Sequence, residues 1–410
     1  MASGHPALAR RLGTADAVVI GLGSMIGAGI FVVLGPAARA AGAGLLIGLA
    51  VAAVVAYCNA TSSARLAARY PTAGGTYLYG RMLLGEFWGY LAGWGFVVGK
   101  TASCAAIALT VGAYVWPAQA HPIAVAAVVA LTAVNYAGVQ KSAWLTRAIV
   151  AVVLAVLTGV TVAALSSGAA APARLDLAGT SAGGLLQAAG LLFFAFAGYA
   201  RIATLGEEVR EPARTIPRAI PLALSIVLVV YAVVALAALM VLGPDRLAVS
   251  MAPLSEAVSA AGVGWLTPVV RAGAAIAALG SLLALLLGLS RTTLAMARDR
   301  HLPHPVAAVH PKFHVPHRAE LLIGLVVAVL AAGTDLRNAI GFSSFAVLTY
   351  YAIANAAALA LRADEGRPPW PIPVIGVIGC VVLAVALPLS AVISGVGVLG
   401  AGIAVYGWRR

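Results

Sequence analysis

Long uninterrupted runs of apolar residues constrain the fold of this chain more than any other feature. Twelve such runs follow one another, separated by short connections. A helix needs about 20 apolar residues to cross about 30 Å of hydrocarbon, and the runs lack the alternation typical of barrel strands. Because a backbone in lipid must satisfy its own hydrogen bonds, we expect every run to be a helix. The sequence therefore predicts an all-α polytopic membrane protein.

The predicted spans form a single transmembrane domain over residues 1–410. They lie near residues 14–38, 42–64, 86–116, 121–140, 144–166, 182–206, 216–242, 264–290, 318–333, 338–361, 371–388 and 390–407. Hydrophobic residues make up 62% of the chain and charged residues 10%, whereas soluble domains are about half apolar and a quarter charged. The composition therefore excludes an ordinary soluble domain.

The positive charge of the chain is dispersed between the apolar runs. A nucleic-acid-binding face needs its Lys and Arg clustered, so the net charge of +13 does not indicate nucleic acid. The partner that the apolar runs indicate is a lipid bilayer. With the N-terminus inside, 19 of the 26 Lys and Arg residues fall on the inner side and five on the outer side. The positive-inside rule then predicts a protein of the cell membrane with both termini cytoplasmic.

Cofactor, metal and catalytic sites have no candidates in the sequence. The three cysteines, Cys58, Cys104 and Cys380, lie far apart in apolar runs, which suggests neither a disulfide framework nor a metal motif. His310 and His314 are four residues apart, but Pro311 and Pro316 interrupt any helix that would align them. No paired carboxylates or Ser-His-Asp order can be assembled within the spans, so we expect no enzyme activity and no cofactor.

Two of the spans carry an interruption near their midpoint. The first contains Gly21, Gly23, Gly27 and Gly29, and the sixth is interrupted around Gly198. Helix-breaking glycines at membrane depth are tolerated where the freed backbone lines a cavity. The alternative interpretation is that these glycines allow helices to pack closely.

The two interruptions occupy matching positions in a repeat. Because five spans separate the copies, residues 14–166 and 182–361 are predicted to be inverted-topology halves, followed by two additional helices over 371–407.

Four sequence blocks resemble the amino acid permeases of the amino acid-polyamine-organocation superfamily. In chain order they are GLGSMIGAGIFVVLGPAA, YPTAGGTYLYGRMLLGEFWGYLAGW, FFAFAGYARIATLGEEVREPARTIPRAI and LGSLLALLLGLSRTTLAMARDRHLPHPVAAVHPKFHVPHRA. The resemblance implies a LeuT-like fold with broken first and sixth helices. It also implies secondary active transport of an amino acid or small amine by alternating access.

The resemblance also implies a substrate site at the two breaks. The backbone of Gly27, Ala28 and Gly29 would receive the substrate carboxylate. Carbonyls near Met25, Phe194 and Ala197 would receive the amino group beside Gly198, and Phe194 would be an aromatic gate. Broken helix ends fit these roles, because one end offers free N–H groups and the other free carbonyls.

Several positions depart from the pattern of the relatives. Many relatives have a hydroxyl residue where Ala28 stands and an acid where Ala200 stands, and several have a lysine where Val153 stands. Ser281 matches the hydroxyl of the cation site of the family. The coupling ion, H⁺ or Na⁺, therefore stays open.

Lys100 and Arg201 are the two cations predicted to lie within spans. A charge at membrane depth is costly unless it faces a cavity or a partner, so Lys100 is expected to line the substrate pathway. Alternatively, Lys100 reaches the inner interface along its apolar stem, and Arg201 reaches toward the loop that follows it. The predicted function is an amino acid permease. The alternative is a membrane-embedded amino acid sensor or a facilitator without ion coupling.

Overall fold

Helices form nearly all of the regular structure in this chain. The computed structural model describes residues 12–70, 74–138, 143–203 and 209–408. The helices up to residue 166 are α1 (Thr14–Met25), α2 (Ala28–Val32), α3 (Leu34–Ala41), α4 (Leu45–Arg69), α5 (Gly75–Leu84), α6 (Glu86–Val115), α7 (Ala120–Tyr136) and α8 (Ala143–Ser166). Those that follow are α9 (Ala182–Phe196), α10 (Ala200–Ala203), α11 (Pro212–Val249), α12 (Pro253–Ala260), α13 (Thr267–Arg298), α14 (His317–Gly333), α15 (Leu336–Leu359), α16 (Pro371–Ala386) and α17 (Leu389–Trp408).

The helices confirm the prediction of an all-α polytopic membrane protein. In the described part of the chain, nine helical segments are long and apolar enough to cross a membrane, and α9 and α16 are shorter apolar helices. The 17-residue helix α14 occupies the remaining predicted span, 318–333. The outer surface is apolar as well, with exposed side chains such as Leu325 on α14 and Val385 on α16. Such a surface fits contact with lipid chains.

Three helices extend beyond their predicted ends. Helix α13 continues to Arg298 instead of ending near residue 290, and α4 continues to Arg69 instead of residue 64. Helix α11 also continues, to Val249, but a non-helical Gly243 with φ +72° kinks it directly after the predicted end at residue 242. Arginine and threonine lower hydropathy without breaking a helix. The apolar pattern therefore marks where a run leaves the hydrocarbon rather than where the helix stops.

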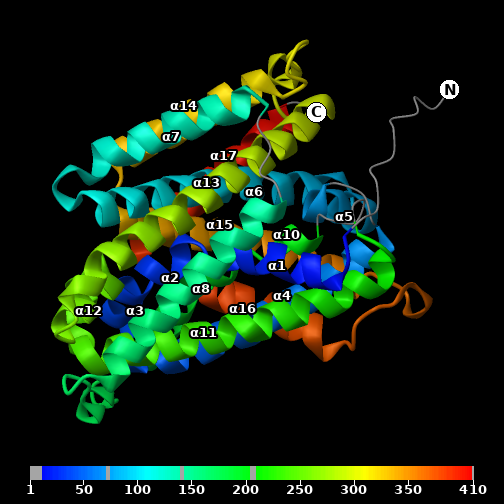
Figure 1. The fold of residues 1–410 in the computed structure, drawn as a ribbon. Coiled ribbons are helices and arrows are strands. Elements are labelled where there is room, and N and C mark those ends of the chain that lie inside the picture. The colour runs from blue at the N-terminus through cyan, green and yellow to red at the C-terminus, as the bar shows by residue number, and fades with distance from the viewer. Residues whose placement is uncertain (1–11, 71–73, 139–142, 204–208, 409–410) are drawn as a thin grey trace.

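Helix α6 lies in the middle of the bundle. Every residue from Gly99 to Tyr114 is buried, and α6 packs against α5, α7, α13 and α15. The short helices α1 and α2 lie in the interior of the view, with α8 crossing in front of them and α11 running below them, and α10 lies beside α1 (Figure 1). Helices α7 and α14 pair along one edge. The broken segments are thus enclosed by the longer helices.

Part of the charge count falls on positions outside the described residues. These positions are Arg10, Arg11, Lys141, Arg409 and Arg410. The orientation of the termini and the inverted halves stay predictions.

Candidate functional site

The first break lies between α1 and α2. Helix α1 ends at Met25, and Ile26 (φ −79°, ψ 58°) and Gly27 (φ −107°, ψ −140°) leave helical geometry before α2 begins at Ala28. The Gly27 N–H donates to the Met25 carbonyl at 2.8 Å. An α-helix leaves its first N–H groups without helical partners, so the start of α2 offers backbone donors at the centre of the bundle.

The second break lies between α9 and α10 and touches the first. Ala197, Gly198 and Tyr199 separate the two helices. A Cβ on Gly198 would collide with the carbonyl oxygen of Ser24 and would lie 2.7 Å from the backbone nitrogen of Met25. Only glycine allows this backbone-to-backbone approach. The prediction that both spans are interrupted is confirmed, and the two interruptions meet.

Tyr231 ties the two broken segments together. Its buried hydroxyl donates to the carbonyl of Met25 at 2.5 Å and to that of Ala195 at 3.1 Å. Farther along the first segment, the Tyr114 hydroxyl donates to the Phe31 carbonyl at 2.7 Å. These bonds give interior carbonyls a side-chain donor, which the Met25 carbonyl has in addition to the Gly27 N–H.

A cavity of about 300 Å³ opens at the two breaks. It is lined by all ten residues predicted for the substrate site and the charged pathway, namely Met25, Gly27, Ala28, Gly29, Lys100, Phe194, Ala197, Gly198, Arg201 and Ser281. The volume matches the lower end of the range for small-molecule sites. The sequence therefore brings its candidates to one place, although their roles in binding stay a proposal.

Lys100 lies inside the protein, where its ammonium contacts the second break. Lys100 is buried, with 8% of its surface exposed. Its Nζ donates to the carbonyl oxygen of Ala197 at 3.3 Å, and the Tyr351 hydroxyl donates to the same oxygen, also at 3.3 Å. The structure thus places Lys100 in the cavity wall rather than at an interface.

The glycines of the first break combine two roles. A Cβ on Gly27 would collide with Ser281 Oγ, and a Cβ on Gly29 would lie 2.8 Å from the Cα of Ala195. Both glycines line the cavity and also allow close packing, so the two interpretations of the sequence apply together. Ser281 Oγ is buried and has no hydrogen-bond partner among the described residues. It is a free hydroxyl beside the break.

The cavity also contains residues that the sequence did not single out. Phe96, Ser103 and Ile107 lie on α6 with Lys100, and their spacing of four, three and four residues places them on one helix face. That spacing could have identified them once Lys100 was chosen. Arg291 and Thr292 were missed because α13 was predicted to end before them. Tyr77 and Tyr350 come from α5 and α15, which carry no such signal.

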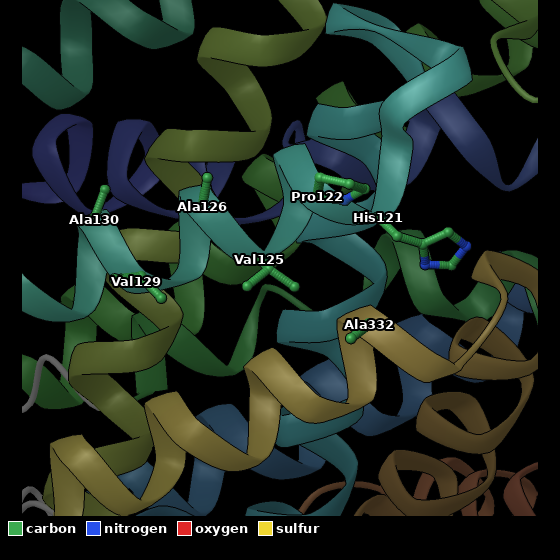
Figure 2. A pocket seen from close by; sticks show the side chains of 7 residues that line it. All are labelled: His121, Pro122, Val125, Ala126, Val129, Ala130 and Ala332. Atoms are coloured by element: carbon green, nitrogen blue, oxygen red, sulfur yellow. The ribbon is translucent and has the colours of Figure 1, made fainter.

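A second hollow lies on the outer surface between α7 and α14. Six of its residues, from His121 to Ala130, belong to α7, and Ala332 belongs to α14. Figure 2 shows Val125 and Val129 on the side of α7 that faces α14. The His121 ring nitrogen Nδ1 lies 2.8 Å from the Ala331 carbonyl. This hollow is open and almost wholly apolar, so it offers little to orient a polar ligand.

Together, the fold and the cavity define a polytopic membrane protein with a central site between two broken helices. The sequence matches the amino acid permease family over residues 12–407. The chain therefore belongs to the amino acid permease family, and it is an integral membrane protein. This confirms the resemblance seen in the sequence motifs.

Individual relatives extend the comparison. An uncharacterized transporter of Mycobacterium tuberculosis (strain ATCC 25618 / H37Rv) is 76% identical over 405 residues, which cover 98% of this chain and 92% of the relative. Cationic amino acid transporter 7, chloroplastic, of Arabidopsis thaliana is 31% identical, over 87% of this chain and 66% of the relative. The branched-chain amino acid permease BcaP of Bacillus subtilis (strain 168) is 27% identical, over 90% of this chain and 84% of the relative.

Proposed function

We propose that this protein is a secondary active transporter that moves an amino acid or a related small amine across the cell membrane by alternating access. The observation that supports this most strongly is the meeting of two broken helices in one central cavity. Discontinuous helices at mid-membrane depth are the usual construction of a transporter substrate site. The names of the relatives, all of them transporters or permeases, agree with it.

The substrate carboxylate is proposed to bind the backbone of Gly27, Ala28 and Gly29, with the N–H groups of Ala28 and Gly29 as donors because the Gly27 N–H already donates to the Met25 carbonyl. Ala28 supplies no side-chain hydroxyl, so backbone donors carry this role.

The amino group is proposed to face a backbone carbonyl at the breaks. The carbonyls of Met25 and Ala197 already accept hydrogen bonds from side chains. The carbonyl of Phe194 is therefore the proposed acceptor. The half-buried ring of Phe194 is proposed to cover the substrate as a gate.

Alternating access requires that the cavity open to one side at a time. Tyr77 of α5 and Arg291 and Ala295 near the end of α13 line the cavity, so it extends toward the end of the bundle where these elements lie. The charge count predicts that this end faces the cytoplasm. We propose that the inverted halves, 14–166 and 182–361, move relative to each other, so that the cavity closes at this end and opens at the opposite end. The helices over 371–407 lie outside the repeat.

The coupling ion is proposed to be H⁺ or Na⁺. Ser281 offers one free hydroxyl beside the break, whereas Na⁺ is usually held by several oxygen ligands. Val153, which is fully buried, replaces the lysine of some relatives. Separate gradients of the two ions distinguish these cases.

Uptake of labelled amino acids into proteoliposomes tests the proposal, with Na⁺ and proton gradients imposed one at a time. Phe194→Ala changes the gate, and Val129→Ala, a smaller truncation in the outer hollow and away from the cavity, is the control. We expect accumulation driven by one gradient, strongly reduced by Phe194→Ala and unchanged by Val129→Ala. Binding without uptake would instead identify a sensor, and uptake indifferent to both gradients a facilitator.

A further inference from the structure

Positive charge dominates the wall of the central cavity. Lys100, Arg201 and Arg291 line it, and none of the lining residues in the described part of the chain is an aspartate or glutamate. Arg291 is exposed and Arg201 half-buried, so water screens Arg291 in particular. Lys100 is buried, and its charge therefore acts most strongly on whatever occupies the cavity.

Lys100 has no anionic partner among the described residues. Its ammonium carries three N–H donors and makes one hydrogen bond, to the Ala197 carbonyl. Cys104, one turn farther along α6, is buried and carries a thiol rather than a carboxylate. A buried charge is retained only where a partner compensates its desolvation. The geometry therefore leaves two donors of Lys100 available for an anion.

Donors of the chain itself occupy the carbonyls that would attract a cation. The carbonyl of Ala197 accepts from Lys100 and Tyr351, and the carbonyl of Met25 accepts from Tyr231. A second ammonium near Ala197 would have to compete with Lys100 and would be repelled by it. This part of the cavity is thus suited to a negative group.

We infer that Lys100 binds a second carboxylate, so that the cavity takes an amino acid with an acidic side chain. This inference rests on the proposed function and names the substrate class of the same site. The α-carboxylate lies at the start of α2, and the side-chain carboxylate pairs with Lys100 across the cavity of about 300 Å³. Arg291 adds positive potential, which concentrates anions in the pathway.

The same charges oppose a cationic substrate. A guanidinium or ammonium side chain in the cavity would meet Lys100 at short range, with no carboxylate of the described lining to compensate it. The word "cationic" in the name of the Arabidopsis relative therefore does not transfer to this chain. A site for acidic amino acids and a site for basic amino acids predict opposite substrate preferences, which uptake of both kinds of amino acid can distinguish.

The test uses the full chain in proteoliposomes and measures uptake of labelled L-glutamate, L-aspartate, L-leucine and L-arginine. Lys100→Met keeps most of the apolar stem and removes the charge, and Lys100→Arg keeps the charge. Lys312→Met is the matched control, because Lys312 is exposed on the connector between α13 and α14. We expect glutamate or aspartate to be preferred over arginine at least tenfold. Lys100→Met should reduce the glutamate-to-leucine uptake ratio at least tenfold, and the other two variants should keep it.

Ratios between substrates cancel differences in the amount of folded transporter. If Lys100→Met does not insert, the preference of the unsubstituted protein decides alone. Uptake of leucine or arginine without uptake of glutamate and aspartate would overturn the inference and leave the proposed function standing. An unchanged ratio in Lys100→Met would also overturn it. If a monodisperse, reconstituted protein takes up no amino acid, both the inference and the proposed function fail.

Discussion

The phenol of Tyr77 donates a hydrogen bond of 2.6 Å to the carboxylate of Asp299, which joins α5 to the C-terminal end of α13. The hydroxyl oxygen of Tyr77 also lies 2.8 Å from Nδ1 of His301. Arg81 forms ion pairs with Asp299 and Glu86. Burial and the hydrogen bond to Asp299 raise the pKa of Tyr77 well above its usual value, so the phenol stays a donor. Because Tyr77 also lines the cavity, this cluster holds part of the cavity wall in place.

Removal of this hydroxyl tests its contribution. We expect Tyr77→Phe to lower the free energy of unfolding by about 1 kcal/mol, because Asp299 loses a donor while the ring is kept. Tyr79→Phe is the control, since the buried Tyr79 hydroxyl has no hydrogen-bond partner among the described residues. It should be neutral or slightly stabilising. Thermal unfolding in one detergent measures both variants, and equal losses would show that the bond to Asp299 contributes nothing.

The pair Arg69–Glu365 predicts a pH dependence at the end of α4. The guanidinium lies 3.0 Å from the carboxylate, and the backbone N–H of Arg362 and the side chain of Arg69 lower the pKa of Glu365. A lowered pKa stabilises the fold above the unfolded value, about 4.3 for glutamate, and this stabilisation is lost as the pH falls through the folded value. Glu365→Gln should therefore lower the melting temperature slightly at pH 7, and the difference should vanish in acid. A difference that is constant with pH would contradict this origin.

Cysteine labelling tests the predicted orientation. The native cysteines Cys58, Cys104 and Cys380 are buried, so a single introduced cysteine can be followed in their presence. Ala178 and His304 are both exposed, between α8 and α9 and between α13 and α14 respectively. An impermeant thiol reagent added to intact cells should label Ala178→Cys and not His304→Cys, until the cells are opened. The reverse pattern would invert the assigned topology.

Sequence patterns identified the helices and the centre of the candidate site for physical reasons. Hydrocarbon thickness and backbone hydrogen bonding restrict each apolar run to a helix, so all the predicted spans contain one. The breaks were visible because glycine is needed where Gly198 meets the backbone of Ser24 and Met25. Lys100 was visible because a lysine within an apolar run requires a partner.

What the sequence could not supply was the partner of each group. Nothing local connects Lys100 to the carbonyl of Ala197, 97 residues away, or Tyr77 to Asp299, 222 residues away. Hydropathy ended the eighth span before Arg291, because a charge lowers hydropathy even where the helix continues. The extent of the cavity toward α5 and α13 therefore emerged only from the three-dimensional arrangement.

The last prediction concerns two glycines that line the same cavity in different surroundings. The φ of Gly27 is negative, at −107°, so the need for glycine there is a matter of space. A Cβ on Gly27 would collide with Ser281 Oγ, whereas a Cβ on Gly288 would meet nothing within 4 Å. Overpacking a close contact costs about 1–3 kcal/mol, but alanine in an open helical position gains up to about 1 kcal/mol over glycine.

We therefore expect Gly27→Ala to destabilise the protein by about 1–3 kcal/mol and to weaken substrate binding, and Gly288→Ala to be neutral or stabilising. Adding Ser281→Ala to Gly27→Ala removes the colliding oxygen and leaves Ser281 Cβ 3.1 Å from the new methyl group, so the double variant should recover part of the loss. Thermal unfolding and ligand-induced stabilisation measure the three variants. If Gly27→Ala and Gly288→Ala behaved alike, or if Ser281→Ala restored nothing, the close approach of the first break to α13 would not constrain the site.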